Sequence, residues 1–263
     1  MLCEKPFAIT AADAAACFDA AEVADRLCIE GLMWRHHPQT RLAQQLVDDG
    51  AIGRLSHIRA ALSVNVAPGE TSGGSESWAA VRYWIWAVTA SAGIRLFGGQ
   101  PLRVSAAQVV DTAEGADGGD LRLAATFALP GDALAQFDVA LDFPRRDELE
   151  LIGANGKITI PDPWLCRYGY LELERGGVSE RLSADPSGRF RLSSHFDNDD
   201  AYRIEFQNAS LQITGGTAPT FGRADAIDQA AAIEAVRQAA TTGTWIAMPA
   251  PTAPNTSTHG EPS

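Results

Sequence analysis

The first residues of the chain place a carboxylate, an ammonium group and a proline at consecutive positions. Leu2 and Cys3 are apolar and indicate the end of a strand. Pro6 offers no N–H to a sheet and disfavours a helical residue before it. Glu4 and Lys5 are therefore expected on a rigid corner between a strand and a helix, where both charges can face a ligand. The alternative is a solvated corner held by a salt bridge.

A second polar group follows a short apolar segment. Arg35, His36 and His37 stand directly before Pro38. A guanidinium and two imidazoles offer many hydrogen-bond donors at fixed angles, which suits a pocket for a polyol. The alternative is a core histidine bonded to a nearby carbonyl. Glu30 is a candidate buried partner for Arg35.

Two helices must position these groups. The first is predicted from Ala11 to Leu27 and is rich in alanine. The second is predicted from Gln39 to Asp49 and is closed by Gly50 and Gly53.

The middle of the chain is predicted to be β-sheet. Side chains alternate with period two from Leu55 to Val66. Further strands, joined by turns rich in Gly and Asp, are predicted at residues 102–110, 121–129, 133–143, 149–153, 157–160, 170–174 and 178–182. Helices return at 202–213 and 224–240. Sheet and helices segregated in this way predict the α+β class.

Composition excludes several classes of function. A net charge of −12 argues against nucleic acid and anionic membrane surfaces as partners. No apolar run approaches a membrane span, and no secretory signal is found. The four cysteines have no metal-binding spacing and do not need to pair, which fits a reducing cytoplasm.

The order of these motifs resembles that of a known protein family. Cys-Glu-Lys-Pro, then a segment ending in Arg-x-His-Pro, then a helix ending in Gly-Ala-Ile-Gly resembles the glucose–fructose oxidoreductase / inositol dehydrogenase / MocA (Gfo/Idh/MocA) family, from Leu2 to about Met248. The resemblance implies NAD or NADP as cofactor and hydride transfer to or from a sugar, polyol or diol. It also implies a large open, mainly antiparallel sheet with helices on one face, whose other face pairs with a second subunit in a homodimer or larger homo-oligomer.

The resemblance assigns roles to the candidate residues. Lys5 would lie beside the nicotinamide and the substrate hydroxyl as the catalytic residue, where an ammonium stabilises developing alkoxide charge. Glu4 and Pro6 would shape this cofactor-binding corner. Arg35, His36 and His37 would bind substrate. No metal is expected. The alternative for Lys5 is an exposed lysine without a role.

The family's phosphate-binding Gly-x-Gly-x-x-Gly loop is missing from this sequence. We therefore expect residues 1–27 to be the remnant of a dinucleotide-binding domain, 28–248 to be a substrate-binding and oligomerisation domain, and 249–263 to be a disordered tail. Such a truncated chain is expected to be inactive alone. The alternative function is a non-catalytic remnant, acting as a binding or dimerising module.

A second family motif, Gly-Gly-Gly-Ala-Leu-x-Asp-x-Gly-x-His or Tyr, is also missing. Its Asp should fall near Trp84 and its His or Tyr at Val88, within a segment that holds three of the six tryptophans. Read with the third base of each codon joined to the next two, Trp78-Ala79 must give Gly, Trp84-Ile85 must give Asp, and Trp86-Ala87 must give Gly. We infer a frameshift over about residues 70–92, between two compensating shifts.

Overall fold

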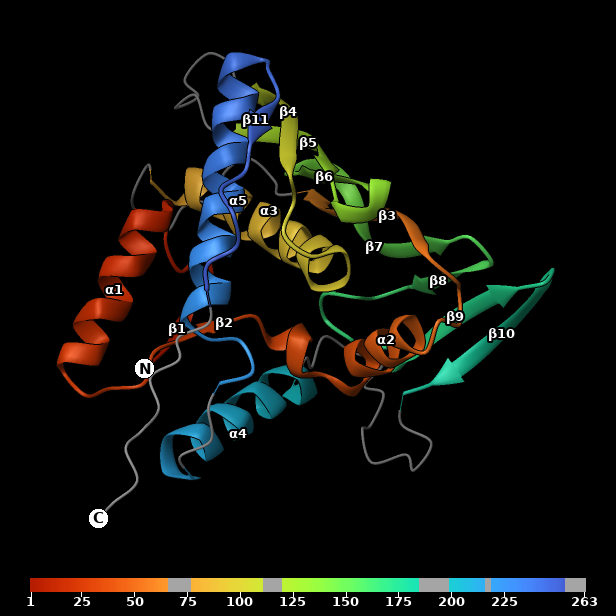
Figure 1. The fold of residues 1–263 in the computed structure, drawn as a ribbon, viewed down its shortest axis with the longest axis horizontal. Helices are drawn as coiled ribbons and strands as arrows, with labels where there is room; N and C mark the ends of the chain where they lie inside the picture. Colours follow the sequence, from red (N-terminus) through yellow and green to blue (C-terminus); the bar gives the residue numbers. More distant parts are fainter. Residues whose placement is uncertain (66–76, 111–119, 185–198, 216–218, 254–263) are drawn as a thin grey trace.

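The computed structural model describes residues 1–65, 77–110, 120–184, 199–215 and 219–253, arranged as Figure 1 shows. The helices are α1 (Ala11–Val23), the 3-10 helix η1 (Met33–His36), α2 (Pro38–Asp48), α3 (Ser77–Gly98), the 3-10 helix η2 (Pro130–Asp132), α4 (Asp199–Gly215) and α5 (Arg223–Thr242). The strands are β1 (Leu2–Glu4), β2 (Ile29–Gly31), β3 (Leu55–Asn65), β4 (Arg103–Val110), β5 (Asp120–Ala128), β6 (Leu134–Ala140), β7 (Asp142–Gly153), β8 (Gly156–Ile160), β9 (Tyr170–Arg175), β10 (Val178–Ser183) and β11 (Ile246–Ala247).

Nine of these strands form one sheet, and β1 and β2 form a separate parallel pair. The order in the large sheet is β10-β9-β8-β7-β3-β6-β5-β4-β11. Among these described strands, β3 and β6 are parallel and the other neighbours are antiparallel. The fold is α+β as predicted, with a sheet that is mixed.

The parallel pair has a local cause. The single strand predicted at 133–143 is wrong, because the chain turns at Leu141 between β6 and β7. The first of these strands pairs with one edge of β3 and the second with the other edge. One unbroken strand cannot pair with both edges, so the turn produces the mixed sheet.

The core lies between this sheet and the helices that cover one of its faces. α3 lies across β3, β5 and β6, and α5 lies along β4 and α3 (Figure 1). Ile58 and Phe127 of the sheet are fully buried, as is Ile94 of α3. The opposite face of the sheet is polar, with ion pairs such as Arg146–Asp138, whose nitrogen and oxygen are 2.6 Å apart. The alternating strand pattern therefore separates an apolar face from a charged face.

The predicted end of the first helix needs correction. The first helix ends at Val23 instead of Leu27, because the chain leaves helical conformation at Asp25, which has φ +53°. Its start is fixed by Thr10, whose hydroxyl accepts a hydrogen bond from the Asp13 N–H at 3.1 Å.

Among the described residues, no helix is long and apolar enough to span a membrane. The tail predicted to be disordered is described only up to Ala253.

Candidate functional site

The Glu-Lys-Pro corner lies at the end of β1. The β1–β2 pairing places Cys3 opposite Glu30, and the Lys5–Pro6 peptide bond is cis. The half-buried Lys5 side chain reaches η1, where its Nζ lies 3.2 Å from Met33 Sδ. Burial lowers the pKa of the Lys5 ammonium, against the opposing effect of nearby carboxylates. The predicted corner is therefore present, and it directs the ammonium inward.

Glu205 of α4 faces the same corner. It is only 2% exposed, and the Leu32 N–H donates a hydrogen bond to its carboxyl. Its Oε1 has no hydrogen-bond partner among the described residues. Burial, followed by the charge of Glu4, raises the pKa of Glu205 to about 7, while Lys5 acts in the opposite direction. A pKa near 7 places the titration of this carboxyl near neutral pH.

Glu30 supports the corner from β2. Its Oε1 accepts a hydrogen bond from the Phe7 N–H at 3.4 Å, and its buried Oε2 has no partner in the described structure. Burial raises the pKa of Glu30, with the Arg35 charge opposing. The expected ion pair between these two residues is wrong, because Arg35 pairs with Asp225 of α5 instead.

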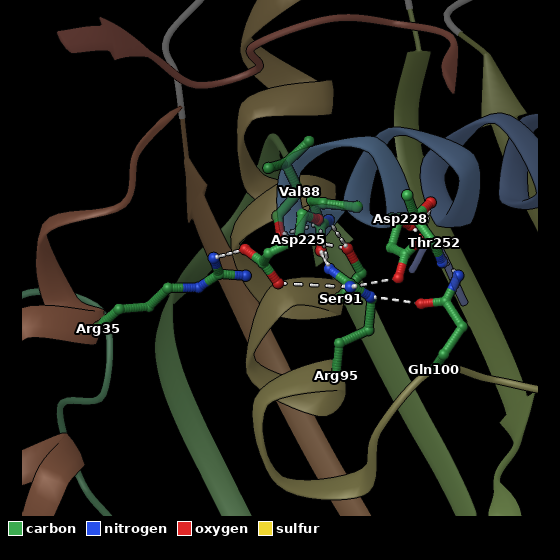
Figure 2. Close-up of polar contacts among 9 residues, drawn as sticks. Arg35, Val88, Ser91, Arg95, Gln100, Asp225, Asp228 and Thr252 are labelled. Atoms are coloured by element: carbon green, nitrogen blue, oxygen red, sulfur yellow. Dashed lines mark hydrogen bonds and ion pairs between the residues drawn. The ribbon is translucent and has the colours of Figure 1, made fainter. Parts of the chain in front are cut away.

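Arg35 belongs to a buried polar network shown in Figure 2. Its Nη1 lies 2.5 Å from Asp225 Oδ2, and Arg95 of α3 approaches the other oxygen of the same carboxylate at 3.4 Å. Arg95 also donates to Gln229 at 2.8 Å. These contacts tie η1 and α3 to α5. The Arg35 guanidinium, which also lies 4.7 Å from the ring centroid of Phe221, is thus held by protein groups.

The two predicted histidines have different surroundings. His37 is 2% exposed and caps α2, with its Nδ1 accepting the Gln39 N–H at 3.1 Å. His37 therefore has a structural position in the core. His36 Nδ1 lies 3.2 Å from Asn208 Nδ2 of α4. Burial, then the charges of Arg35 and Arg41, lower the pKa of His36 to about 4, so the ring is neutral at pH 7.

His36 also borders a hollow of about 510 Å³ between α2 and α4. The other side chains around it are Pro38, Arg41, Arg203, Ile204, Gln207 and Asn208. Along η1, Met33 and His36 are three residues apart and lie on one side of a 3-10 helix. Along α4, Glu205 and Asn208 have the same separation. The Lys5 corner and the hollow are therefore neighbouring parts of one region between η1 and α4.

Glu205 was not anticipated from the sequence. The apolar residues Ile204 and Leu211 lie near helical spacing in this segment, yet Leu211 is 63% exposed. The buried side chains are instead Ala201, Glu205 and Ala209, spaced four residues apart. Small residues at this spacing allow the closest approach of a helix to its neighbours. A glutamate inside such a stripe is the signal that could have revealed the residue.

The positions expected to carry the family's Asp and His or Tyr lie on α3. Val88 is 2% exposed and its carbonyl accepts a hydrogen bond from Gln229 at 3.3 Å. Trp84 is half-buried, with the Arg237 guanidinium 5.4 Å from its ring centroid. Both positions therefore lie on a helix, and their side chains supply no proton-transfer group. Residues 66–76, and the side chains of 77–83, lie outside the described structure.

The corner suits a hydroxyl-rich ligand better than a phosphate. The unpartnered oxygens of Glu30 and Glu205 can accept hydrogen bonds from hydroxyls, and the Lys5 ammonium can donate one. The same carboxylates would repel a pyrophosphate. Among the described residues, no group of three or more His, Cys, Asp or Glu side chains could hold a metal ion.

Comparison with known proteins identifies relatives by sequence and neighbours by fold. No family model matches the chain. The D-xylose 1-dehydrogenase (NADP+) 2 of Haloferax volcanii is 26% identical over 256 residues, which cover 94% of this chain and 73% of the relative. Levoglucosan dehydrogenase, solved with NADH and levoglucosan, superposes with a TM-score of 0.80 at 18% identity, covering 95% of this chain and 73% of that chain. KijD10, a 3-ketoreductase of Actinomadura kijaniata solved with NADP, gives a TM-score of 0.76 at 21% identity, with 90% and 70% covered.

These similarities extend over most of the chain and concern oxidoreductases in each case. The relative's name includes NADP+, and the two structural neighbours were solved with NADH or NADP. Over at least 90% of its length, the chain therefore shares the fold of these solved oxidoreductases.

Proposed function

We propose that this chain is the substrate-binding and oligomerisation part of an NAD(P)-dependent oxidoreductase. Its reaction would transfer a hydride between nicotinamide and a hydroxyl-bearing carbon of a sugar, polyol or diol. The observation that carries the proposal is the half-buried Lys5 ammonium, which faces buried carboxylate oxygens of Glu30 and Glu205 that lack partners. The sugars in the names of the relatives agree with this substrate class.

Each residue of the corner would have a separate role in this reaction. Lys5 would donate a hydrogen bond to the reacting hydroxyl and stabilise the negative charge that develops on its oxygen. Glu4 and Pro6 would fix the corner next to the nicotinamide ring, which supplies the hydride acceptor when bound. His36, neutral and open to the neighbouring hollow, would bind a more distant hydroxyl. Arg35 and His37, which are buried, would have a structural role beneath the surface that carries His36.

The alternative function is a non-catalytic binding or dimerising module. The observation in its favour is the helix α3, where Trp84 and Val88 occupy the positions of the expected proton-transfer residues. Such a module would bind the sugar and leave added NAD+ or NADP+ unreduced.

Calorimetric titration with D-xylose and with levoglucosan tests the proposal without a cofactor. The chain contains two lysines, so Lys5→Met has a matched control in Lys157→Met, which removes a lysine on the sheet. We expect saturable binding by the natural chain and by the control. Lys5→Met should bind roughly 10- to 100-fold more weakly, because a charge-assisted hydrogen bond is lost. Equal affinity of the two variants, or a folded natural chain that binds neither sugar, would overturn the assignment.

A further inference from the structure

The buried carboxyl of Glu205 has one oxygen that nothing in the described structure uses. The Leu32 N–H bonds to this carboxyl, whereas Oε1 is buried and has no partner. Leaving a buried carboxylate oxygen without a hydrogen bond costs free energy. The cost falls if a ligand hydroxyl donates to that oxygen or if the carboxyl takes up a proton.

The neighbouring Lys5 ammonium is also incompletely paired. The hydrogen bond assigned to its Nζ goes to Met33 Sδ, a weak thioether acceptor. An ammonium group has three donors, so donors remain for a ligand oxygen. A hydroxyl placed between Lys5 and Glu205 would accept a hydrogen bond from the first and donate one to the second.

The other ionisable groups at the corner are less suited to proton exchange. Glu4 is exposed. Glu30, like Glu205, has one oxygen without a partner in the described structure, but the charge of Arg35 favours its ionised form. Burial, with the charges of Glu4 and Glu205, raises the pKa of the Tyr202 phenol above its ordinary value of 10.0. Burial raises the pKa of Glu205 to about 7, where a group can both accept and release a proton at neutral pH.

Building on the proposed function, we propose that Glu205 exchanges the proton of the substrate hydroxyl held by Lys5. In the oxidising direction, the hydroxyl O–H bond breaks and its proton passes to the Glu205 carboxylate. Oxidised nicotinamide, when bound, would accept the hydride of the same carbon as its C–H bond breaks and the C=O bond forms. The products are a carbonyl compound, reduced nicotinamide and protonated Glu205, and the reverse direction returns the proton.

Proton release on sugar binding tests this role without any turnover. Titrations with D-xylose and levoglucosan are carried out at pH 7 in buffers with different enthalpies of ionisation. A hydroxyl donating to Glu205 favours the ionised carboxyl. Because the pKa of that group is about 7 in the free protein, we expect release of up to about half a proton per sugar.

Glu205→Gln keeps an acceptor for the Leu32 N–H and should bind the sugar with no proton release. Glu180→Gln, on the exposed strand β10, should behave as the natural chain. One contrary result is that the natural chain binds sugar without releasing a proton, and another is that Glu205→Gln releases as much as the natural chain. Either result would show that Glu205 has only a structural role beside η1. A natural chain that binds no sugar would overturn the proposed function and this role together. The two failures are therefore distinguishable.

Discussion

Burial acts in opposite senses on the two ionisable residues at the candidate site. It lowers the pKa of Lys5 and raises that of Glu205, because in each case the charged form loses hydration. Their mutual attraction offsets this effect only in part. The two pKa values are thereby brought closer together, which favours proton transfer between groups that share a ligand.

The raised pKa of Glu205 predicts a pH-dependent stability. The folded value of about 7 lies above the ordinary 4.5, so the folded protein holds more protons than the unfolded chain between these pH values. The contribution of Glu205 to stability is therefore present below about pH 4.5 and is lost as the pH rises through 7. Glu205→Gln removes the ionisable group, so the variant does not lose this stability as the pH rises. Between pH 5 and pH 8 its free energy of unfolding should improve relative to the natural chain by about 2.5 kcal/mol.

Urea unfolding at the two pH values measures this difference. Glu180→Gln serves as the reference, because its side chain is exposed on β10. Parallel pH profiles for the natural chain and Glu205→Gln would contradict the raised pKa.

Sequence reasoning succeeds at single residues where the neighbours in the chain determine the geometry. Pro6 follows Lys5 directly, so the corner could be predicted from five residues. The partner of Arg35 could not, because Asp225 lies 190 residues away and reaches it only through the packing of α5. Glu205 was missed for the same reason, since its role depends on a distant strand end.

At the level of elements, alternation and turn chemistry predicted most strands. The hairpin between β9 and β10 follows from Gly176 and Gly177, both with positive φ. The turn at Leu141 has no such signal, so β6 and β7 were merged in the prediction. Their separation depends on which edge of β3 each strand pairs with, and this is a long-range property.

The helix α3 gives a prediction at the level of DNA. If residues 70–92 are read out of frame, the gene carries one insertion or deletion near codons 65–70 and a compensating one near codons 91–95. Restoring the frame would reinstate a Gly-rich backbone, an Asp near position 84 and a Tyr or His near position 88, while leaving both flanks unchanged. Resequencing the locus measures this directly. An uninterrupted frame, with no indel relative to related genes, would show that Trp84 and Val88 are natural residues of the helix.

At the scale of the whole molecule, the uncovered face of the sheet predicts self-association. A hollow of about 540 Å³ on it is bordered by charged side chains such as Arg146 and Glu148 and by small ones, including the exposed Ala107 and Ala124 of neighbouring strands. We expect a dimer by light scattering coupled to size-exclusion chromatography. Ala124→Arg should shift the population to monomers, because a bulky charge would be buried in the interface. Ala16→Arg on the exposed side of α1 is the control, and a natural chain that stays monomeric at high concentration would refute the expectation.

A crystal structure of the chain soaked with levoglucosan or D-xylose tests the central claim most directly, because it locates the ligand. The account predicts a sugar oxygen within about 2.7–3.2 Å of Lys5 Nζ, with a hydroxyl at similar distance from Glu205 Oε1. Other hydroxyls of the same sugar should point towards His36 and the hollow beside it. A sugar bound elsewhere on the molecule, with the Lys5 corner free of ligand at saturating concentration, would contradict the account.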